Sequence, residues 1–304
     1  MRNLVLLAVV GLVAQMVDGS LGMAYGVTST SLLLAVGLTP AIASASVHIS
    51  EVGTTLASGV AHWRLGNVDW EKIGWMALPG AAGAFVGAYA LSSVSAAFTE
   101  PFVAVFLFAL GIYVLARFAF SGKDRVVGRA VPGRFLSPLG LFAGFMDAVG
   151  GGGWGPISTP TLLSSGRMEP RKVVGTVDTS EFLVALAASG GFLLGLSLSQ
   201  IPFGVVGALL AGGIVAAPIA AWVVRYLNAR LLGTAVGGFI LLTNAHTFLS
   251  TLGLKGAGTI PVYGAIAVVW AAALYYAISA MRQSAESAFG SATPQAGSRT
   301  PGQG

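Results

Sequence analysis

The sequence predicts an all-α polytopic membrane protein with two inverted repeats, each a short re-entrant-type helical hairpin plus three transmembrane helices, and one extra C-terminal helix. The composition, the length of the apolar segments and an internal duplication carry this prediction. Hydrophobic residues make up 55% of the 304 residues and charged residues only 9%, whereas a soluble domain carries about 25% charged residues. The chain has too little charge to cover a water-facing surface, which excludes a soluble enzyme.

Apolar segments with the length of a membrane-spanning helix, about 20 residues, follow one another along the chain. Two of them are too long for one crossing, and glycines interrupt each in the middle. The segments run over 3–36, 40–63, 73–92, 98–120, 135–166, 173–197, 203–224, 231–250 and 260–281. The basic, then apolar N-terminus also fits a cleaved signal peptide. We expect a retained helix instead, because the same pattern recurs at 135–147, where no leader can lie.

The two long segments are copies of one pattern. With Leu12–Glu51 placed over Leu141–Glu181, Asp18 meets Asp147 and both stretches end in Ser-Glu, at an offset of 129 residues that becomes 130 after one insertion. Such internal duplication is typical of membrane transporters. It divides the chain into a first repeat (1–120), a basic cytoplasmic linker (121–134), a second repeat (135–250), an extra transmembrane helix (260–281) and a disordered tail rich in Gly, Ser and Pro (284–304).

The distribution of Lys and Arg predicts that the repeats are inverted, because basic residues favour the cytoplasmic side. In the first repeat the loop 64–72 carries bases and the loop 92–100 carries none. In the second repeat the loop 197–202 carries none and the loop 224–230 carries two. Equivalent loops are therefore expected on opposite sides of the membrane, which requires an odd number of crossings in each repeat. The long first segment of each repeat must then fold back on itself.

Each hairpin is expected to consist of two short helices, over 4–17 and 24–36 in the first repeat and over 135–147 and 154–165 in the second. Arms of 12 to 14 residues span about 18–21 Å at the helical rise, which is less than the apolar core of about 30 Å. The glycine-rich turns would lie inside the membrane, where irregular backbone is tolerated only if it is buried in protein or lines a cavity.

The turns, and the helices that they open, predict a site for an anion. A helix N-terminus offers free N–H groups and partial positive charge, glycine lets an anion approach that backbone, and neighbouring hydroxyls add donors. In the alternative, the glycines serve only close helix packing. The candidate binding residues are Gly22, Tyr25, Gly26, Thr28, Ser29 and Thr30 in the first repeat and Gly151, Gly152, Gly153, Trp154, Gly155, Ser158 and Thr159 in the second.

Ionisable residues within the apolar segments are candidates for proton coupling or gating, because a charge in the bilayer costs at least about 2.5 kcal/mol. A protonated carboxyl can donate to an anion, and an ionised one repels it. Each also has a structural alternative: the aspartates can cap helices, and the other groups can hold helices together by hydrogen bonds. The candidates are Asp18, His48, Glu51, Asp147, Asp178 and Glu181.

Several kinds of chemistry are excluded. The sequence contains no cysteine, which rules out thiol nucleophiles and cysteine-ligated metals. Nucleotide-binding and hydrolase motifs are absent, so we expect no enzyme, no cofactor and no dedicated metal site. The net charge is +5. The basic residues lie between apolar segments and therefore indicate membrane topology rather than a surface for nucleic acid.

At the paired hairpins the sequence resembles the TauE/SafE family of membrane transporters. The resemblance rests on GLVAQMVDGSLGMAYGVTSTSLLLAVGLTP and GLFAGFMDAVGGGGWGPISTPTLLSSGRMEP, each followed by a helix with Ser-Glu, and it covers 4–281. It implies a multi-pass protein of the inner (plasma) membrane that moves a small anion such as sulfite or sulfoacetate, generally outward, and it leaves a homodimer open. The rival expectation is a cation or metal transporter with Asp18, Glu51, Asp147, Asp178 and Glu181 as ligands, against which the positive helix ends argue.

Overall fold

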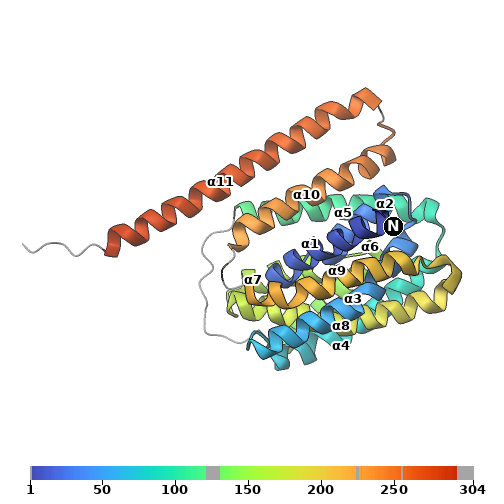
Figure 1. Ribbon diagram of the computed structural model, residues 1–304, viewed down its shortest axis with the longest axis horizontal. Helices are drawn as coiled ribbons and strands as arrows, with labels where there is room; N and C mark the ends of the chain where they lie inside the picture. Colours follow the sequence, from blue (N-terminus) through green and yellow to red (C-terminus); the bar gives the residue numbers. More distant parts are fainter. Residues whose placement is uncertain (1, 121–130, 224–225, 227, 255, 293–304) are drawn as a thin grey trace, which may run out of the picture.

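A computed structural model describes residues 2–120, 131–223, 226, 228–254 and 256–292, and no strand occurs in this part of the chain (Figure 1). The predicted all-α class is therefore confirmed. The α-helices are α1 (Arg2–Leu21), α2 (Tyr25–Ala35), α3 (Pro40–Arg64), α4 (Trp70–Ser93), α5 (Ala96–Ala119), α6 (Gly133–Gly150), α7 (Trp154–Ser165), α8 (Pro170–Gly195), α9 (Phe203–Val223), α10 (Ala229–Thr251) and α11 (Ile260–Ala292), with short 3-10 turns at Leu198–Gln200 and Gly256–Thr259.

Six helices in the described part have both the length and the hydropathy of membrane spans: α1, α4, α5, α8, α9 and α11. Helices α3 and α10, with 25 and 23 residues, are equally long but carry buried polar side chains such as Glu51 and Asn244. The fold is that of a multi-pass membrane protein whose polar residues face its interior.

Each repeat begins with a hairpin of one long and one short helix. The first arms, α1 and α6, have 20 and 18 residues, about 30 and 27 Å, and are longer than the half-spans that the sequence predicts. They continue through Asp18 and Asp147 because only a glycine in the left-handed region ends each helix, Gly22 with φ 66° and Gly151 with φ 69°. The second arms, α2 and α7, have 11 and 12 residues, too few to cross the apolar core.

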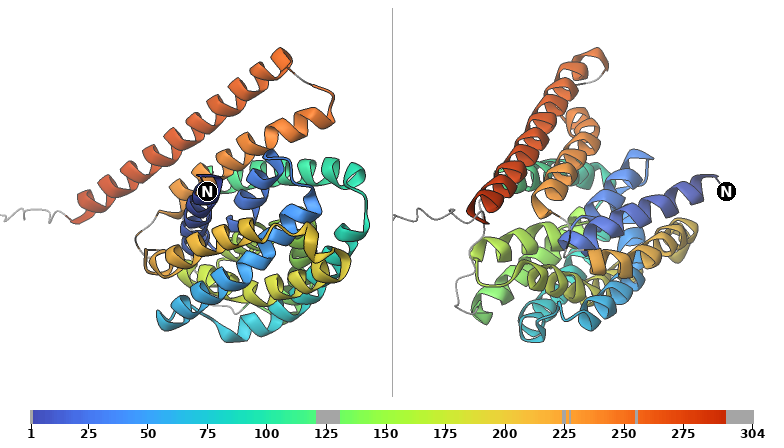
Figure 2. Two further views of the ribbon diagram at one scale, coloured as in Figure 1. Left: turned by 45° about the vertical axis from the view of Figure 1, so that its right-hand side comes forward. Right: turned by 60° about the vertical axis from the view of Figure 1, so that its left-hand side comes forward.

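The helices pack in matched pairs. Helices α3 and α8 contact each other, α4 packs against α6 as α9 packs against α1, α4 contacts α8 as α9 contacts α3, and α5 pairs with α10. Each of these contacts has its counterpart when α1–α5 are exchanged with α6–α10, which is a pseudo-two-fold relation between the repeats. Helix α11 stands outside this relation and lies beside α10, along one side of the bundle, in both views of Figure 2.

Glycines let the outer helices approach closely. A Cβ added at Gly11 on α1 would lie 2.3 Å from the backbone oxygen of Leu209 on α9, and one added at the equivalent Gly140 on α6 would lie 2.3 Å from the backbone oxygen of Met76 on α4. Helices in lipid associate through such close contacts between small residues. Part of the glycine excess, 43 residues in all, therefore serves helix packing.

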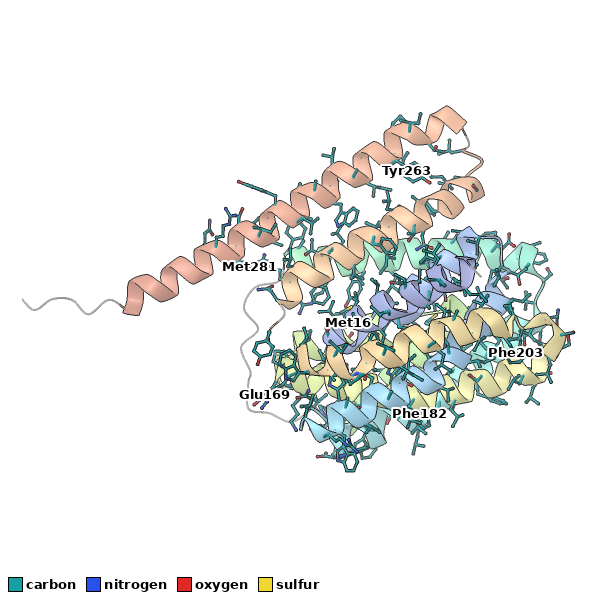
Figure 3. All side chains as sticks on the ribbon, in the orientation of Figure 1. Met16, Glu169, Phe182, Phe203, Tyr263 and Met281 are labelled. Atoms are coloured by element: carbon teal, nitrogen blue, oxygen red, sulfur yellow. The ribbon has the colours of Figure 1, made fainter. Side chains whose placement is uncertain are left out.

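Basic side chains gather at one end of the bundle. The α3–α4 and α7–α8 connections lie at the left-hand end in Figure 1, and the α4–α5 and α8–α9 connections lie at the right-hand end. Figure 3 labels one residue at each end, Glu169 just before α8 and Phe203 at the start of α9. The left-hand connections and the helix ends beside them contain Arg64, Lys72, Arg167, Arg171 and Lys172, whereas 92–100 and 197–202 contain no lysine or arginine.

The C-terminal helix is longer than the sequence predicts. Helix α11 continues to Ala292, so that 284–292, expected to belong to a disordered tail, are helical. The first proline of this region is Pro294, and no residue before it breaks a helix as proline does. The remainder of the expected tail, 293–304, lies outside the described residues, as does 121–130 of the expected linker.

Candidate functional site

The two hairpin turns meet inside the bundle, backbone against backbone. A Cβ added at Gly26 would lie 2.8 Å from the Cα atom of Gly152, and one added at Gly152 would lie 2.1 Å from the amide nitrogen of Val27. Both turns are buried. The structure therefore brings together the two glycine-rich stretches that the sequence indicates as one site.

A pair of reciprocal hydrogen bonds joins the turns. The Thr30 hydroxyl donates to the carbonyl oxygen of Gly151, and the Thr159 hydroxyl donates to the carbonyl oxygen of Gly22 at 2.6 Å. The two threonines are repeat equivalents, and so are the two glycines. We call these four residues the cross-turn latch. Because both hydroxyl protons serve the latch, neither is available to a ligand while it is closed.

The other predicted binding residues divide into three groups. Gly155 serves the contact between the turns, since an added Cβ would lie 2.5 Å from Met23 Cα, and Gly153 packs on its own hairpin. Ser29 and Ser158, which are repeat equivalents, are buried, and their hydroxyls have no hydrogen-bond partner within the described residues. Thr28 is not brought to the others, because it lines an apolar groove between α1, α2, α10 and α11.

Tyr25 and Trp154 are the first residues of the two short helices, and both are fully buried. The Tyr25 hydroxyl lies 3.1 Å from the Ser50 hydroxyl on α3, and the Trp154 indole N–H donates to the carbonyl oxygen of Val177 on α8 at 3.1 Å. Each aromatic ring thus ties a short helix to the long helix that follows it. This fixes the start of the short helix relative to the buried acids of that long helix.

Asp147 on α6 is fully engaged. Its Oδ1 accepts from the backbone N–H groups of Gly153 at 2.7 Å and Trp154 at 2.9 Å, and its Oδ2 lies 3.0 Å from Nε2 of His48 on α3. The other ring nitrogen of His48 lies 2.8 Å from the carbonyl oxygen of Ser44. Because a carbonyl oxygen only accepts, Nδ1 carries a proton, and a second proton is shared between Nε2 and the Asp147 carboxyl. Asp147 therefore closes its hairpin, as the capping alternative proposes, and also pairs with His48.

Asp18 on α1, the equivalent of Asp147, has fewer partners. Its Oδ1 accepts from the Tyr25 N–H at 3.4 Å, and its Oδ2 has no hydrogen-bond partner within the described part of the chain. The position equivalent to His48 is Asp178. Asp18, Asp178 and Glu181 present carboxylate oxygens that all lie within 4.8 Å of one another, and all three residues are buried. Such a cluster takes up protons or another cation, because buried like charges repel strongly.

Glu51 faces the turns. A Cβ added at Gly26 would lie 3.1 Å from its Oε1, and its Oε2 lies 3.9 Å from Nε2 of His48. Neither carboxylate oxygen has a hydrogen-bond partner among the described residues. This side chain is therefore directed at the start of α2 instead of fastening one helix to another.

Three polar residues beside Asp18 belong to the same region, although the sequence does not single them out as site residues. The His62 Nε2–H donates to the carbonyl oxygen of Gly19 at 3.0 Å, and Ser58 and Gln15 are buried around the same glycine. Comparison of the repeats holds the signal that would have found them. The equivalents of Gln15, Ser58 and His62 are Gly144, Ala188 and Phe192, so each is polar in one repeat and apolar in the other.

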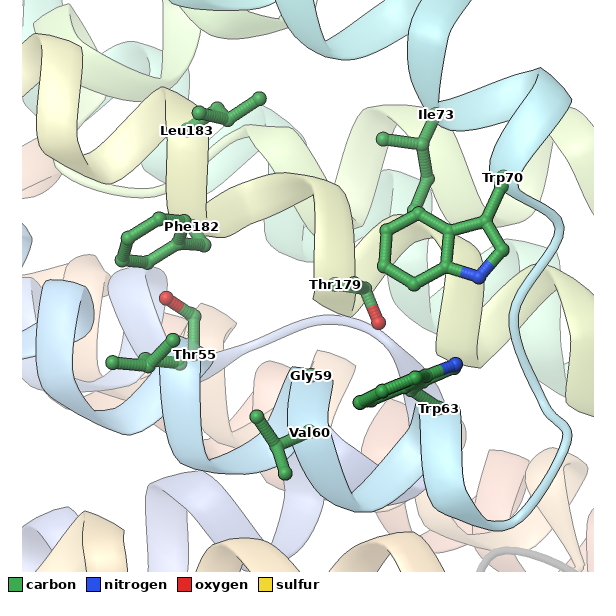
Figure 4. Close-up of a pocket in the computed structure, with 10 residues that line it drawn as sticks. Thr55, Gly59, Val60, Trp63, Trp70, Ile73, Thr179, Phe182 and Leu183 are labelled. Atoms are coloured by element: carbon green, nitrogen blue, oxygen red, sulfur yellow. The ribbon is translucent and has the colours of Figure 1, made fainter.

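Three apolar grooves lie on the surface of the described part of the bundle. One groove of about 270 Å³ runs between α3, α4 and α8, and Figure 4 shows Trp63 and Trp70 on one side of it and Phe182 on the other. Its lining suits lipid chains better than an anion. In this conformation the ionisable residues at the turns are buried and closed off from both ends.

A multi-pass helical bundle with two buried glycine-rich turns and a central group of ionisable side chains has the architecture of a membrane transporter. The chain belongs to the TauE/SafE family, since the family described as "Sulfite exporter TauE/SafE" matches residues 7–247. It is a transporter of the cell membrane and not an enzyme.

A relative supports this assignment along almost the whole chain. The chain is 51% identical over 281 residues to the "Probable membrane transporter protein YtnM" of Bacillus subtilis (strain 168), an alignment that covers 92% of this chain and 94% of the relative. No solved structure matches the chain.

Proposed function

We propose that this protein exports a small sulfur-containing anion, sulfite or an organosulfonate, across the cell membrane. The observation that carries the proposal is the meeting of the two hairpin turns, where Ser29 and Ser158, the fifth residues of α2 and α7, keep unpartnered, buried hydroxyls. The two hydroxyls and the N-terminal end of α2 offer donors to an anion without a buried arginine, whereas Asp147 takes the first N–H groups of α7. The family description, which names sulfite, supports the same class of substrate.

The substrate binds beside the turn contact, next to Ser29 and Ser158, when the cross-turn latch opens. The closed latch leaves no room between Gly26 and Gly152. We propose that the two repeats are inverted relative to the bilayer and that one rocks against the other to open the site to each side in turn. The pseudo-two-fold pairing of helices and the basic side chains at one end of the bundle support this arrangement.

Protons accompany the anion in this proposal. The region around the turns contains five buried carboxyl groups, on Asp18, Glu51, Asp147, Asp178 and Glu181, and one imidazole, on His48. Ionised carboxylates would repel the substrate, whereas protonated ones can donate to it. Glu51, beside Gly26, is placed best for that role.

Counterflow into proteoliposomes tests the substrate and the coupling together. Labelled sulfite, sulfoacetate and thiosulfate are offered at two pH values to vesicles loaded with the same unlabelled anion. We expect counterflow of at least one of them, faster at the lower pH, and at least a tenfold loss in Glu51→Gln. Glu100→Gln, which changes an exposed acid at the start of α5, serves as the control. Uptake of none of the three anions would contradict the substrate class, and uptake independent of pH would contradict proton coupling.

The grouping of Asp18, Asp178 and Glu181 favours a second candidate function, transport of a cation. Thermal unfolding of the purified protein separates the two candidates. Stabilisation by sulfite and not by divalent metal ions supports the anion exporter. Stabilisation by a divalent ion that also crosses the membrane in counterflow supports the rival.

A further inference from the structure

The two repeats place different charges at equivalent sites. We define the first half-site as Asp147 with His48 and Glu51, and the second half-site as Asp18 with Asp178 and Glu181. In the first half-site the Asp147 carboxyl lies 3.0 Å from the His48 imidazole, and the pair with its shared proton is neutral overall. In the second half-site the imidazole is replaced by a third acid, Asp178, within 4.8 Å of the other two. When ionised, the Asp18–Asp178 pair therefore carries two negative charges that its counterpart does not.

No nearby base offsets those charges. His62 Nε2 lies 3.9 Å from an oxygen of Asp178, but the ring is neutral because Nε2–H donates to Gly19 and Nδ1 accepts from the Asn67 amide at 3.2 Å. Lys72 and Lys172 lie at the end of the bundle, where Lys72 pairs with Glu71 at 2.8 Å and Lys172 donates to the carbonyl oxygen of Val68 at 3.1 Å. Within the described residues, the groups that face Asp18 and Asp178 from α3 and α8 are acids, hydroxyls and this neutral ring.

The surroundings of the second half-site contain oxygen atoms where the first has carbon. A Cβ added at Gly19, the neighbour of Asp18, would lie 3.3 Å from the Ser58 hydroxyl and 3.6 Å from the Gln15 amide nitrogen. Both side chains are fully buried, and neither has a hydrogen-bond partner among the described residues. Leaving such groups unpaired is costly. In the first half-site Gly144 and Ala188 occupy the equivalent positions, and neither has a polar side-chain atom that needs a partner.

We propose that the second half-site binds a sodium ion through Asp18, Asp178 and Glu181, with Gln15 and Ser58 completing its oxygen ligands. The ion offsets one of the two extra negative charges, and a proton on one of the carboxyls offsets the other. Oxygen ligands suit hard cations better than zinc or copper, and a buried site cannot keep the water shell that Mg²⁺ retains. A proton alone would leave the side-chain oxygen of Gln15 without a partner.

A role in coupling follows, and this part rests on the proposed function. With sodium bound, the second half-site repels an anion at the turns less strongly, so each ligand strengthens the binding of the other.

Sodium binding is tested on the purified full-length protein in detergent, without sulfite, in NaCl or choline chloride of equal ionic strength. We expect saturable binding of one ²²Na⁺ per chain and a Tm that rises with Na⁺ and not with choline. Asp178→Asn should weaken binding at least tenfold, and Glu100→Gln should leave it unchanged. Asp178→His places the imidazole of the first half-site in the second, and it should fold, bind no sodium and be as stable in choline as in sodium.

Several results would overturn the proposal. The proposal is wrong if the protein binds no ²²Na⁺ or if Asp178→Asn binds as much as the unaltered protein. It is also wrong if lowering the pH in choline raises the Tm as much as Na⁺ does, or if an equal concentration of Mg²⁺ displaces Na⁺. Sulfite counterflow in sodium and in choline then separates the site from the proposed function. Sodium binding without any sulfite transport supports the ion site and contradicts the proposed sulfite export. Sulfite transport without sodium binding supports the export and contradicts the ion site.

Discussion

Asp18 and Asp147 occupy equivalent positions in the two repeats, yet they perform different tasks. Asp147 accepts two backbone hydrogen bonds and pairs with His48, whereas Asp18 accepts one long hydrogen bond of 3.4 Å and leaves an oxygen free. The first is a structural connection within its hairpin. The second is available to a ligand.

This difference predicts unequal costs of substitution. Asp147→Ala leaves the buried His48 imidazole without its partner, and breaking a buried pair in this way costs about 3–5 kcal/mol. Asp18→Ala removes one weak hydrogen bond and relieves repulsion with Asp178, so we expect a loss of less than about 1 kcal/mol. Thermal unfolding in detergent measures both. A larger loss for Asp18→Ala than for Asp147→Ala would show that the roles are misassigned.

At the scale of the elements, the hairpins are held against each other by backbone contact and by the cross-turn latch. Gly26→Ala would place a methyl group 2.8 Å from Gly152 Cα, and overpacking of this kind costs about 1–3 kcal/mol. We expect lower stability and loss of counterflow. Gly74→Ala on α4 is the matched control, because nothing lies within 4 Å of its added Cβ. Equal activity of the two variants would contradict a tight contact between the turns.

Opening the latch requires both of its hydrogen bonds to break. Thr30→Val and Thr159→Val each remove one hydroxyl donor from the opposite turn, at a cost of about 1 kcal/mol to the closed state. If opening limits the rate, a loss of this size accelerates exchange by about fivefold. Counterflow rates of the single and double variants measure the effect. Slower exchange in both single variants would show that the hydroxyls serve the substrate instead of the latch.

The hairpins also show where sequence reasoning ends. The duplication locates both turns, because it aligns Gly22 with Gly151 and Gly26 with Gly155. It does not reveal that Thr30 reaches Gly151, since a sequence carries no distances between helices of different repeats. The predicted first arms are too short. Asp18 and Asp147 are typical turn residues, but each helix ends only where a glycine adopts a positive φ.

At the scale of the whole molecule, the inversion of the repeats predicts opposite sides for equivalent loops. Because the chain contains no cysteine, single cysteines can be introduced without background. Glu71→Cys, in the α3–α4 region, and Ser199→Cys, in the equivalent α8–α9 connection, are both exposed. In intact cells we expect a membrane-impermeant maleimide to label Ser199→Cys and to label Glu71→Cys only after lysis. Labelling of both from the same side would contradict inversion.

The all-helical architecture was accessible from composition and periodicity, and the candidate site was accessible only in outline. The acids were found because a carboxylate inside an apolar segment is conspicuous. Ser58 and His62 were missed, because a serine or a histidine in a polar stretch of α3 is not conspicuous until Ala188 and Phe192 are placed beside them. The approach of Asp18 to Asp178 depends on how α1 packs on α8, which no local pattern encodes.

The reciprocity of the latch has a consequence for the history of the molecule. Two bonds that exchange places under a two-fold operation are what a pair of identical subunits would form, each threonine reaching the other subunit's glycine. A single-repeat ancestor could therefore have closed this junction as a dimer before the gene was fused. Once one chain contained both copies, selection could alter one copy alone. His48 and its equivalent Asp178 differ in this way, which two identical subunits cannot do.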